Sequence, residues 1–185
     1  MKNKLRRVNK GIVLLLVLII ITGVISIVDT LKYAARKESA IALSNTFVTD
    51  LASLYAWPKN MPDVDAIEFE KNEKKYYSYF DDAYNKVKPY VYDSNVLKEE
   101  LRSYAMQSIR ENLVNEIKPE QVTFTPKIES ITVDKLTAVV TGSVSIKTTA
   151  KGGKILNKTT GFKLHMEFVN EEWVIVGFYP DGNEF

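Results

Sequence analysis

The chain contains no cysteine, and this absence excludes several kinds of site. A disulfide framework, a thiolate zinc site and a lipid-modified cysteine are all ruled out. Histidine is nearly absent as well, because His165 is the only one. It falls on the polar side of an alternating stretch, and a lone histidine without other ligands does not build a metal site. We therefore expect neither a metal nor a cofactor.

Recognisable catalytic motifs are missing too. The sequence has no Ser/His/Asp spacing, no G-x-S-x-G turn and no glycine-rich loop of the kind that cradles phosphate. The acidic pairs Asp63/Asp65 and Asp81/Asp82 lack the complete ligand set and central glycine of a calcium-binding loop. No catalytic residue is predicted.

The first 28 residues contain no acidic side chain. An uncharged apolar run, Gly11–Val28, follows five cations, which are Lys2, Lys4, Arg6, Arg7 and Lys10. As a helix its 18 residues span about 27 Å, close to the ~30 Å hydrocarbon core of a bilayer. The alternative is a cleaved secretory signal, which usually has small residues at positions −3 and −1. Placing Ala34 or Ala35 at −1 puts Lys32 or Tyr33 at −3, which favours an uncleaved anchor.

The distribution of charge predicts the orientation of this span. Cations beside a span stay in the cytoplasm, so the N-terminus is expected inside and the C-terminal domain outside a cell membrane crossed once. Removing the five N-terminal cations from 25 leaves 20 Lys and Arg against 23 Asp and Glu, a net charge of −3 beyond residue 28. This slightly acidic exterior argues against nucleic acid as the main ligand, because phosphate recognition needs clustered cations.

Three helical stretches are expected beyond the apolar run. Asp29–Ala56 contains no proline or glycine and has apolar residues at helical spacing, which predicts that the spanning helix continues until Pro58. A second helix with an irregular start is predicted over Asp63–Val87. The third is capped by Asp93 or Ser94. It carries an apolar residue about every four positions: Leu97, Leu101, Ala105, Ile109, Leu113 and Ile117.

The apolar period then changes from 3.6 residues to 2. Alternation over Leu136–Ile146 and Phe162–Phe168 predicts two regular strands, with a broken strand in 122–135 before them and another strand in 172–178 after them. Hairpin turns are expected at residues 152–153 and 170–171, where the sequence reads Gly-Gly and Asn-Glu. Gly142 stands where an apolar residue is due, which predicts a bend or bulge.

Helices followed by antiparallel strands with one apolar face indicate an α+β fold. Three helices are expected to pack on one side of a curved, four-stranded antiparallel sheet. We divide the chain into a cytoplasmic basic stub (1–10), a transmembrane helix (11–28), a juxtamembrane helix and loop that continue into the domain (29–62) and the remainder of the exported domain (63–185).

Tyrosine is concentrated in one segment, since six of the ten lie between Tyr76 and Tyr92. One interpretation is that Tyr76, Phe80 and Tyr84 form a buried stripe. The other is a surface that contacts a partner, because tyrosine offers a large contact area at a small entropy cost. The candidate contact residues are Tyr76, Tyr77, Tyr79, Tyr90 and Tyr92.

The order of these elements resembles a nuclear-transport-factor-two-like (cystatin-like) cone domain on a membrane anchor. That order is a basic stub, one span, a continuing helix, further helices and a sheet that ends in EEWVIVGFYP. This arrangement is similar to the VirB-eight-like assembly factors of type IV secretion and conjugation machines and their Gram-positive relatives. The resemblance is one of topology over nearly the whole chain and is carried by no short motif. It implies a non-enzymatic scaffold that self-associates and contacts other channel subunits. Longer Gram-positive relatives have two such domains, whereas this chain has room for one.

Other functions fit the same fold. An isomerase or dehydratase would need an acid or base on the inward faces of Leu136–Ile146 and Phe162–Phe168; none is there, so we expect no enzyme. A carrier of hydrophobic ligands remains open, as does a scaffold for sporulation, division or wall synthesis. The expected partners are the membrane, further copies of the chain and other envelope or secretion-channel proteins.

Overall fold

The computed structural model describes residues 10–58, 60–92 and 95–180. The chain divides into two compact units, residues 1–38 and 39–185, which we describe one at a time. Helix α1 (Lys10–Tyr55) contributes residues to both of them.

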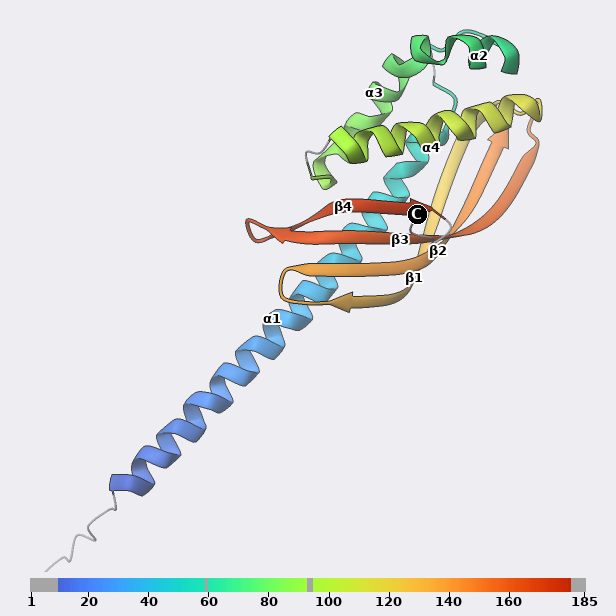
Figure 1. The fold of residues 1–185 in the computed structure, drawn as a ribbon. Coiled ribbons are helices and arrows are strands. Elements are labelled where there is room, and N and C mark those ends of the chain that lie inside the picture. Colours follow the sequence, from blue (N-terminus) through green and yellow to red (C-terminus); the bar gives the residue numbers. More distant parts are fainter. Residues whose placement is uncertain (1–9, 59, 93–94, 181–185) are drawn as a thin grey trace, which may run out of the picture. The chain divides into compact units, whose positions relative to one another are not determined.

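The described part of the first unit is helical throughout (Figure 1). Among the described residues, α1 is the one helix long and apolar enough, by length and composition, to cross a membrane. Its large aliphatic side chains between Leu14 and Val28 are exposed, and contiguous apolar surface of this kind is unusual on a soluble monomer. The predicted basic stub lies outside the described residues except for Lys10, which begins the helix.

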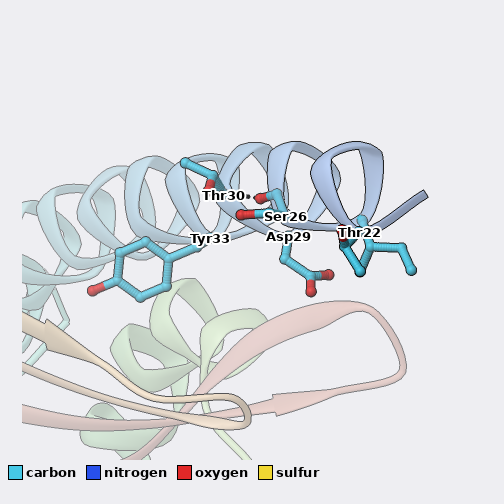
Figure 2. A pocket seen from close by; sticks show the side chains of 6 residues that line it. Thr22, Ser26, Asp29, Thr30 and Tyr33 are labelled. Atoms are coloured by element: carbon cyan, nitrogen blue, oxygen red, sulfur yellow. Dashed lines mark hydrogen bonds between the residues drawn. The ribbon is translucent and has the colours of Figure 1, made fainter. Parts of the chain in front are cut away.

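One face of this part of α1 is polar. Figure 2 shows Thr22, Ser26, Asp29, Thr30 and Tyr33 along one side of the helix, where they line a shallow open hollow. The Thr22 hydroxyl donates to the Leu18 carbonyl oxygen (2.9 Å), and the Thr30 hydroxyl donates to that of Ser26 (2.8 Å). These two hydroxyls are therefore satisfied within their own helix, as threonine commonly is in membrane-spanning helices.

The predicted continuation of the helix beyond the apolar run is confirmed, with α1 ending at Tyr55. Pro58, which cannot donate a backbone hydrogen bond, follows shortly after. In the second unit α1 buries residues at helical spacing: Ala40, Ser44, Phe47, Val48, Leu51 and Leu54. The Trp57 amide donates to the Pro119 carbonyl oxygen (2.8 Å), which joins the end of the helix to the start of the sheet.

The helix with an irregular start predicted over Asp63–Val87 is confirmed in its second half and interrupted in its first. The structure has three pieces there, which are α2 (Ala66–Asn72), the 3₁₀ turn η1 (Glu73–Tyr76) and α3 (Tyr77–Val87). The Asp65 carboxylate caps α2 by accepting a hydrogen bond from the Glu68 amide (2.8 Å). Residues 70–75 are all polar, and a helix without an apolar face to bury has little to hold it.

Helix α4 (Asn95–Val114) carries the predicted apolar stripe. Five of its six members are buried in the helix, namely Leu97, Leu101, Ala105, Ile109 and Leu113. Ile117 lies beyond the helix, because α4 ends at Val114 and Glu116 then adopts a left-handed backbone with φ of 55°. The predicted N-cap, Asp93 or Ser94, lies outside the described residues.

Four antiparallel strands in sequential order form one sheet, which confirms the α+β class. They are β1 (Pro119–Val133), β2 (Thr137–Ala150), β3 (Ile155–Val169) and β4 (Glu172–Pro180). Both predicted hairpin turns are confirmed, with φ of 88° and 83° at Gly152 and Gly153 and of 51° and 69° at Asn170 and Glu171. The long strands bend along their length, so the sheet is curved (Figure 1).

The predicted inward face of β2 and β3 is largely confirmed. Its buried members are Ala138, Val140, Val144, Phe162, Leu164 and Met166. Leu136, predicted to point inward, is instead 60% exposed. The Asp134 amide donates to the Thr137 carbonyl oxygen (2.8 Å), so the hairpin closes there and leaves Leu136 in the turn.

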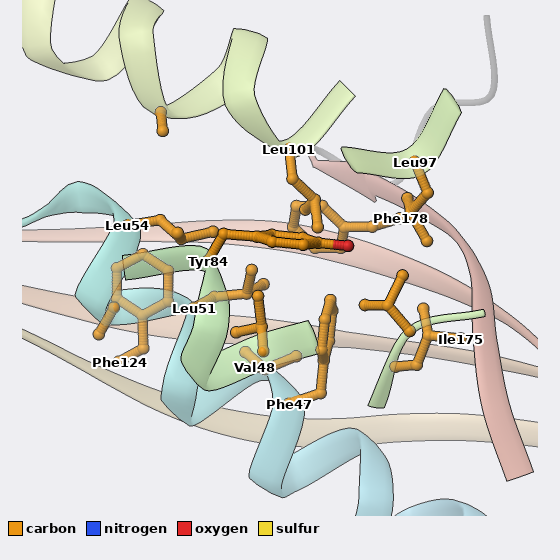
Figure 3. Packing of buried hydrophobic residues seen from close by; sticks show 14 of the residues in the cluster. Phe47, Val48, Leu51, Leu54, Tyr84, Leu97, Leu101, Phe124, Ile175 and Phe178 are labelled. Atoms are coloured by element: carbon orange, nitrogen blue, oxygen red, sulfur yellow. The ribbon is translucent and has the colours of Figure 1, made fainter. Parts of the chain in front are cut away.

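The core of the second unit lies between the helices and the inner face of the sheet. Figure 3 shows Phe47 and Leu51 of α1 below Leu101 of α4, with Ile175 and Phe178 of β4 beside them. The Phe47 and Phe178 rings meet edge to face, with centroids 6.0 Å apart. The C-terminal part of α1 is therefore a central element of this core.

The irregularity predicted at Gly142 is present, on the neighbouring strand. The extra residue lies in β1 between Ile128 and Ser130, and Gly142 of β2 pairs with Ile128 at that point. A β-carbon on Gly142 would overlap the Lys127 carbonyl oxygen and lie 2.8 Å from Phe162 Cζ. Glycine is needed there because the β1 backbone and the Phe162 ring occupy the space of a side chain.

Candidate functional site

Tyr76, the first of the candidate contact residues, belongs to the core. It is 5% exposed and stacks on Phe69, with ring centroids 5.1 Å apart and planes 13° apart. Burial raises the pKa of its hydroxyl, and the nearby Glu68 carboxylate acts in the same direction. Tyr76 therefore contributes to the fold and presents little surface to a partner.

Tyr77 is partly buried and is engaged by α4. The Arg102 guanidinium carbon lies 4.2 Å from the centroid of its ring, and its hydroxyl donates to Glu73 Oε1 (3.3 Å). The other oxygen of Glu73 accepts from Arg110 at 2.6 Å, which ties η1 to α4. The Arg102 guanidinium thus lies over one face of the Tyr77 ring, and the Glu73 carboxylate engages its hydroxyl.

Tyr79 lines a cleft of about 370 Å³ that is bordered by the end of α1, α3, α4 and the start of β1. Apolar side chains supply much of its lining: Leu54, Trp57, Phe80, Met106 and Ile109. Asp82 and Lys86 also line it. A mostly apolar cleft with a few polar groups is a common setting for a small ligand.

Tyr90 lies in the turn η2 (Lys88–Tyr90) and connects that turn to α1. Its hydroxyl donates to Asp50 Oδ2 at 3.0 Å. This hydrogen bond, with burial as the second cause, raises the pKa of the Tyr90 hydroxyl above its ordinary value of 10.0.

Replacing Tyr90 with phenylalanine is expected to destabilise the second unit by about 1 kcal/mol, the typical net contribution of one hydrogen bond. The raised pKa means that the contribution is complete below the ordinary tyrosine pKa and is lost as pH rises through the folded value. Urea unfolding at pH 7.5 and at pH 10 to 11 measures both effects. Tyr92→Phe, at an exposed tyrosine, is the control. An equal effect of both substitutions would contradict a role for the Asp50 bond.

Tyr92 is the most exposed of the five, at 49%. Its amide donates to the Ile175 carbonyl oxygen (2.9 Å), and Val91 forms a parallel bridge with the same residue. The segment therefore covers part of the free edge of β4 and holds the Tyr92 ring at the surface.

The five tyrosines do not form one exposed surface. Tyr76 is buried, Tyr77 and Tyr90 are partly buried and engaged by neighbouring elements, Tyr79 lines the cleft and Tyr92 alone is exposed. The core interpretation therefore describes Tyr76, and contact with a partner stays a prediction for Tyr92. The packing of Tyr77 and Tyr90 depends on Arg102 and Asp50, which are distant in sequence and carry no local signal.

The interior of the second unit contains few polar side chains that could act in catalysis or bind a metal. Ser44 is the one buried polar residue among those described; its hydroxyl donates to the Ala40 carbonyl oxygen (2.7 Å) and lies 3.5 Å from Met166 Sδ. No group of three acidic, histidine or cysteine residues suited to a metal occurs in the described part of the chain. His165 is partly buried on the outer face of β3, with its ring 5.2 Å from that of Tyr179.

No family model matches the chain, and no curated protein matches it either. Among solved structures it is similar to a nuclear transport factor 2 (NTF2-like) superfamily protein from Salmonella enterica (18% identity, TM-score 0.30), with 43% of this chain and 61% of that one covered. The chain thus spans less than two thirds of that protein.

Two further structures are covered more fully. One is a putative calcium/calmodulin-dependent protein kinase II association domain from Xanthomonas campestris, with 15% identity, a TM-score of 0.37 and coverage of 68% of this chain and 94% of that one. The other is an NTF-2-like protein of unknown function from Shewanella oneidensis, with 18% identity, a TM-score of 0.36 and coverage of 65% and 98%.

Proposed function

We propose that the chain is a membrane-anchored, non-enzymatic scaffold that acts by self-association and protein contacts in a bacterial type IV secretion or conjugative transfer channel. The observation that carries this proposal is that α1 belongs both to the apolar run and to the core of the second unit. One uninterrupted helix supplies an exposed apolar run long enough to cross a bilayer and, in Phe47 and Leu51, a buried part of the core of the second unit. A domain whose core includes its own anchor helix suits a protein that works at a membrane surface.

The orientation follows from the cations before the span. They favour a cytoplasmic N-terminus and a domain outside the cytoplasm. Anchoring restricts the domains of neighbouring copies to one thin layer, which raises their effective concentration and makes weak contacts sufficient for assembly. The topological resemblance supports the assignment to a secretion channel. The same anchored domain would serve equally as a scaffold in division, sporulation or wall synthesis.

The apolar interior supports a non-enzymatic role. Acid–base chemistry needs a titratable group within reach of a bound substrate. Among the described residues no acidic side chain, histidine, lysine or arginine is classed as buried; the buried residues with polar groups are Ser44, whose hydroxyl already bonds to its own helix, and the aromatic residues Tyr76, Tyr84 and Trp173.

The cleft beside Tyr79 favours a second candidate, a carrier of a small hydrophobic ligand. Its volume of about 370 Å³ is of the size that holds small molecules. A lipid or other apolar molecule that co-purifies with the chain would support this alternative.

A pull-down of the full-length tagged chain from its own cells, in mild detergent and followed by mass spectrometry, tests the proposal. We expect further copies of the chain together with channel subunits or a transport ATPase. Tyr92→Ser is expected to lower partner recovery if the aromatic segment makes contact, whereas Ile67→Ser, at a similarly exposed apolar residue of α2, serves as the matched control. Recovery of the chain alone with a bound lipid, or turnover of a small substrate by the purified chain, would overturn the scaffold proposal.

A further inference from the structure

The two ends of the sheet carry opposite charge. Because the strands are antiparallel and sequential, the β2–β3 turn lies at one end and the β1–β2 and β3–β4 turns lie at the other (Figure 1). Strands β2 and β3 have 14 and 15 residues, which at about 3.3 Å per residue separates the ends by some 45 Å along the strands. Charges at the two ends are therefore beyond each other's screening length.

The end at the β2–β3 turn is basic. Its exposed lysines are Lys147, Lys151, Lys154 and Lys158, and we call this set the basic end. No acidic residue occurs in the sequence between Asp134 and Glu167, so neither strand of the hairpin neutralises them. The exposed side chain of Ile155, 53% accessible, lies among these lysines.

Neighbouring segments reduce the positive charge of the basic end without cancelling it. Lys118, whose carbonyl oxygen accepts from the Lys151 amide, is paired with Asp63 at 2.5 Å. Glu116 and Glu120 are the acids of the segment that enters β1 there. The four lysines of the basic end still outnumber these two acids.

The opposite end is acidic. Its exposed acids are Asp134, Glu167, Glu171 and Glu172, with Lys135 as the cation of the same turns, and we call this set the acidic end. The two turns are neighbours, because the Phe168 amide donates to the Leu136 carbonyl oxygen (2.8 Å). Leu136, 60% exposed, is the apolar side chain of this end.

We propose that these ends bind each other in successive copies of the chain, with the basic end of one copy against the acidic end of the next and Ile155 close to Leu136. The proposal rests on the scaffold function above and assigns the surface of its self-association. Each end places one exposed apolar side chain among charged ones, which is the arrangement of an apolar centre with a polar rim. Opposite charges steer the encounter and fix its register, and like ends repel.

A second copy accounts for both ends at once. A polyanion such as an anionic lipid surface would use the four lysines and leave the acidic end unexplained. A contact between two different surfaces is heterologous, and it closes into a ring when the rotation between copies permits. Copies anchored by one span all keep the same side toward the membrane, and rotation about the membrane normal preserves that arrangement. Anchoring also supplies the effective concentration that a contact of this small size requires.

Cross-linking tests the proposal directly, because the chain has no cysteine of its own. Two differently tagged full-length copies are co-expressed, one with Ile155→Cys and one with Leu136→Cys, and membranes are treated with a short bis-maleimide. We expect cross-linked pairs that join an Ile155→Cys copy to a Leu136→Cys copy, whereas two Ile155→Cys copies or two Leu136→Cys copies remain at background.

Charge reversal provides the matched control. Lys151→Glu with Lys154→Glu in the Ile155→Cys copy is expected to lower the yield about tenfold, because two attractive contacts become repulsive. Adding Glu171→Lys with Glu172→Lys to the Leu136→Cys copy restores it. Restoration separates lost attraction from lost folding, since a misfolded copy is not rescued by its partner.

Four results overturn the proposal. The first two are equal cross-linking yields for like and unlike cysteine positions, and a cross-linking yield that charge reversal of one end leaves unchanged. The third is a lost yield that charge reversal of the other end does not restore, and the fourth is loss of binding to phosphatidylglycerol vesicles on reversal of the basic end with no change in cross-linking. Copies that still co-purify in any of these cases leave the scaffold function standing on another surface. Copies that neither cross-link nor co-purify, with each other or with envelope proteins, would contradict both the contact between the ends and the scaffold function.

Discussion

Replacing Gly142 with alanine is expected to destabilise the second unit by about 2–3 kcal/mol, as overpacking of a close-packed interior does. The added β-carbon would overlap the Lys127 carbonyl oxygen of β1 and lie within 2.8–2.9 Å of two carbons of the Phe162 ring. The ring is 1% exposed, so it has no free space to move into. The carbonyl belongs to the backbone beside the β1 bulge and can move only if the β1–β2 pairing shifts.

Urea unfolding of the full chain in mild detergent, followed by tryptophan fluorescence, measures this loss. Both tryptophans, Trp57 and Trp173, lie in the second unit, so the signal reports that unit alone. Gly177→Ala is the matched control, because the atoms nearest to its β-carbon would belong to the partly exposed side chain of Tyr179, at 3.1 Å, and not to the backbone of a neighbouring strand. An equal effect of the two substitutions would mean that crowding by β1 is not what requires glycine at residue 142.

Features written in consecutive residues could be predicted from the sequence. The uncharged run that ends at Val28 and the absence of proline and glycine from 29 to 56 are local properties, and they indicated the long helix that α1 forms. The alternation within β2 and β3 and the Gly-Gly turn between them are local as well. Backbone geometry and side-chain period decide such elements before any tertiary contact forms.

Features that depend on register and packing could not be predicted in the same way. A bend or bulge was expected at Gly142 itself, whereas the extra residue lies in β1. The glycine can be read from the sequence, but the β1 backbone and the Phe162 ring that occupy the space of its side chain cannot. Leu136 fits the alternation of β2, yet the hairpin closes one residue later. The separation of charge between the ends of the sheet likewise becomes visible only when the strand order is known, because Asp134 bonds to Thr137 and Thr137 pairs with Glu167.

The candidate contact tyrosines show the same division. Their crowding between residues 76 and 92 is a sequence property, whereas their different environments come from partners distant in the chain. Arg102 covers Tyr77 and Asp50 holds Tyr90, and neither charged residue is marked as a tyrosine partner by its own neighbours. Tyr92 keeps the contact hypothesis because it is the exposed one.

The integration of the anchor helix into the core makes a strong prediction at Phe47. This side chain is fully buried and meets Phe178 edge to face across the inner surface of the sheet (Figure 3). Phe47→Ala is expected to cost about 3–5 kcal/mol, since it removes a large apolar side chain and leaves a cavity. That loss is comparable with the whole stability of a typical small domain, so the second unit is expected to be largely unfolded near 37 °C.

Thr46→Ala and Thr49→Ala are the controls for Phe47→Ala. Both threonines are exposed on the same helix and donate only to its own carbonyl oxygens, Thr46 to Ala42 and Thr49 to Asn45, so each change is expected to stay within about 0.5 kcal/mol.

Because α1 contributes buried residues to the core, a chain truncated to begin at residue 56 should fail to fold, whereas one that begins at Ser39 retains the buried face of α1 and should give a cooperative tryptophan transition. Cooperative folding of the shorter chain would show that α1 is only a tether, and the anchor and domain would then be separable parts. Failure of the shorter chain together with a large Phe47 effect would mean that the span positions a helix that the domain cannot do without.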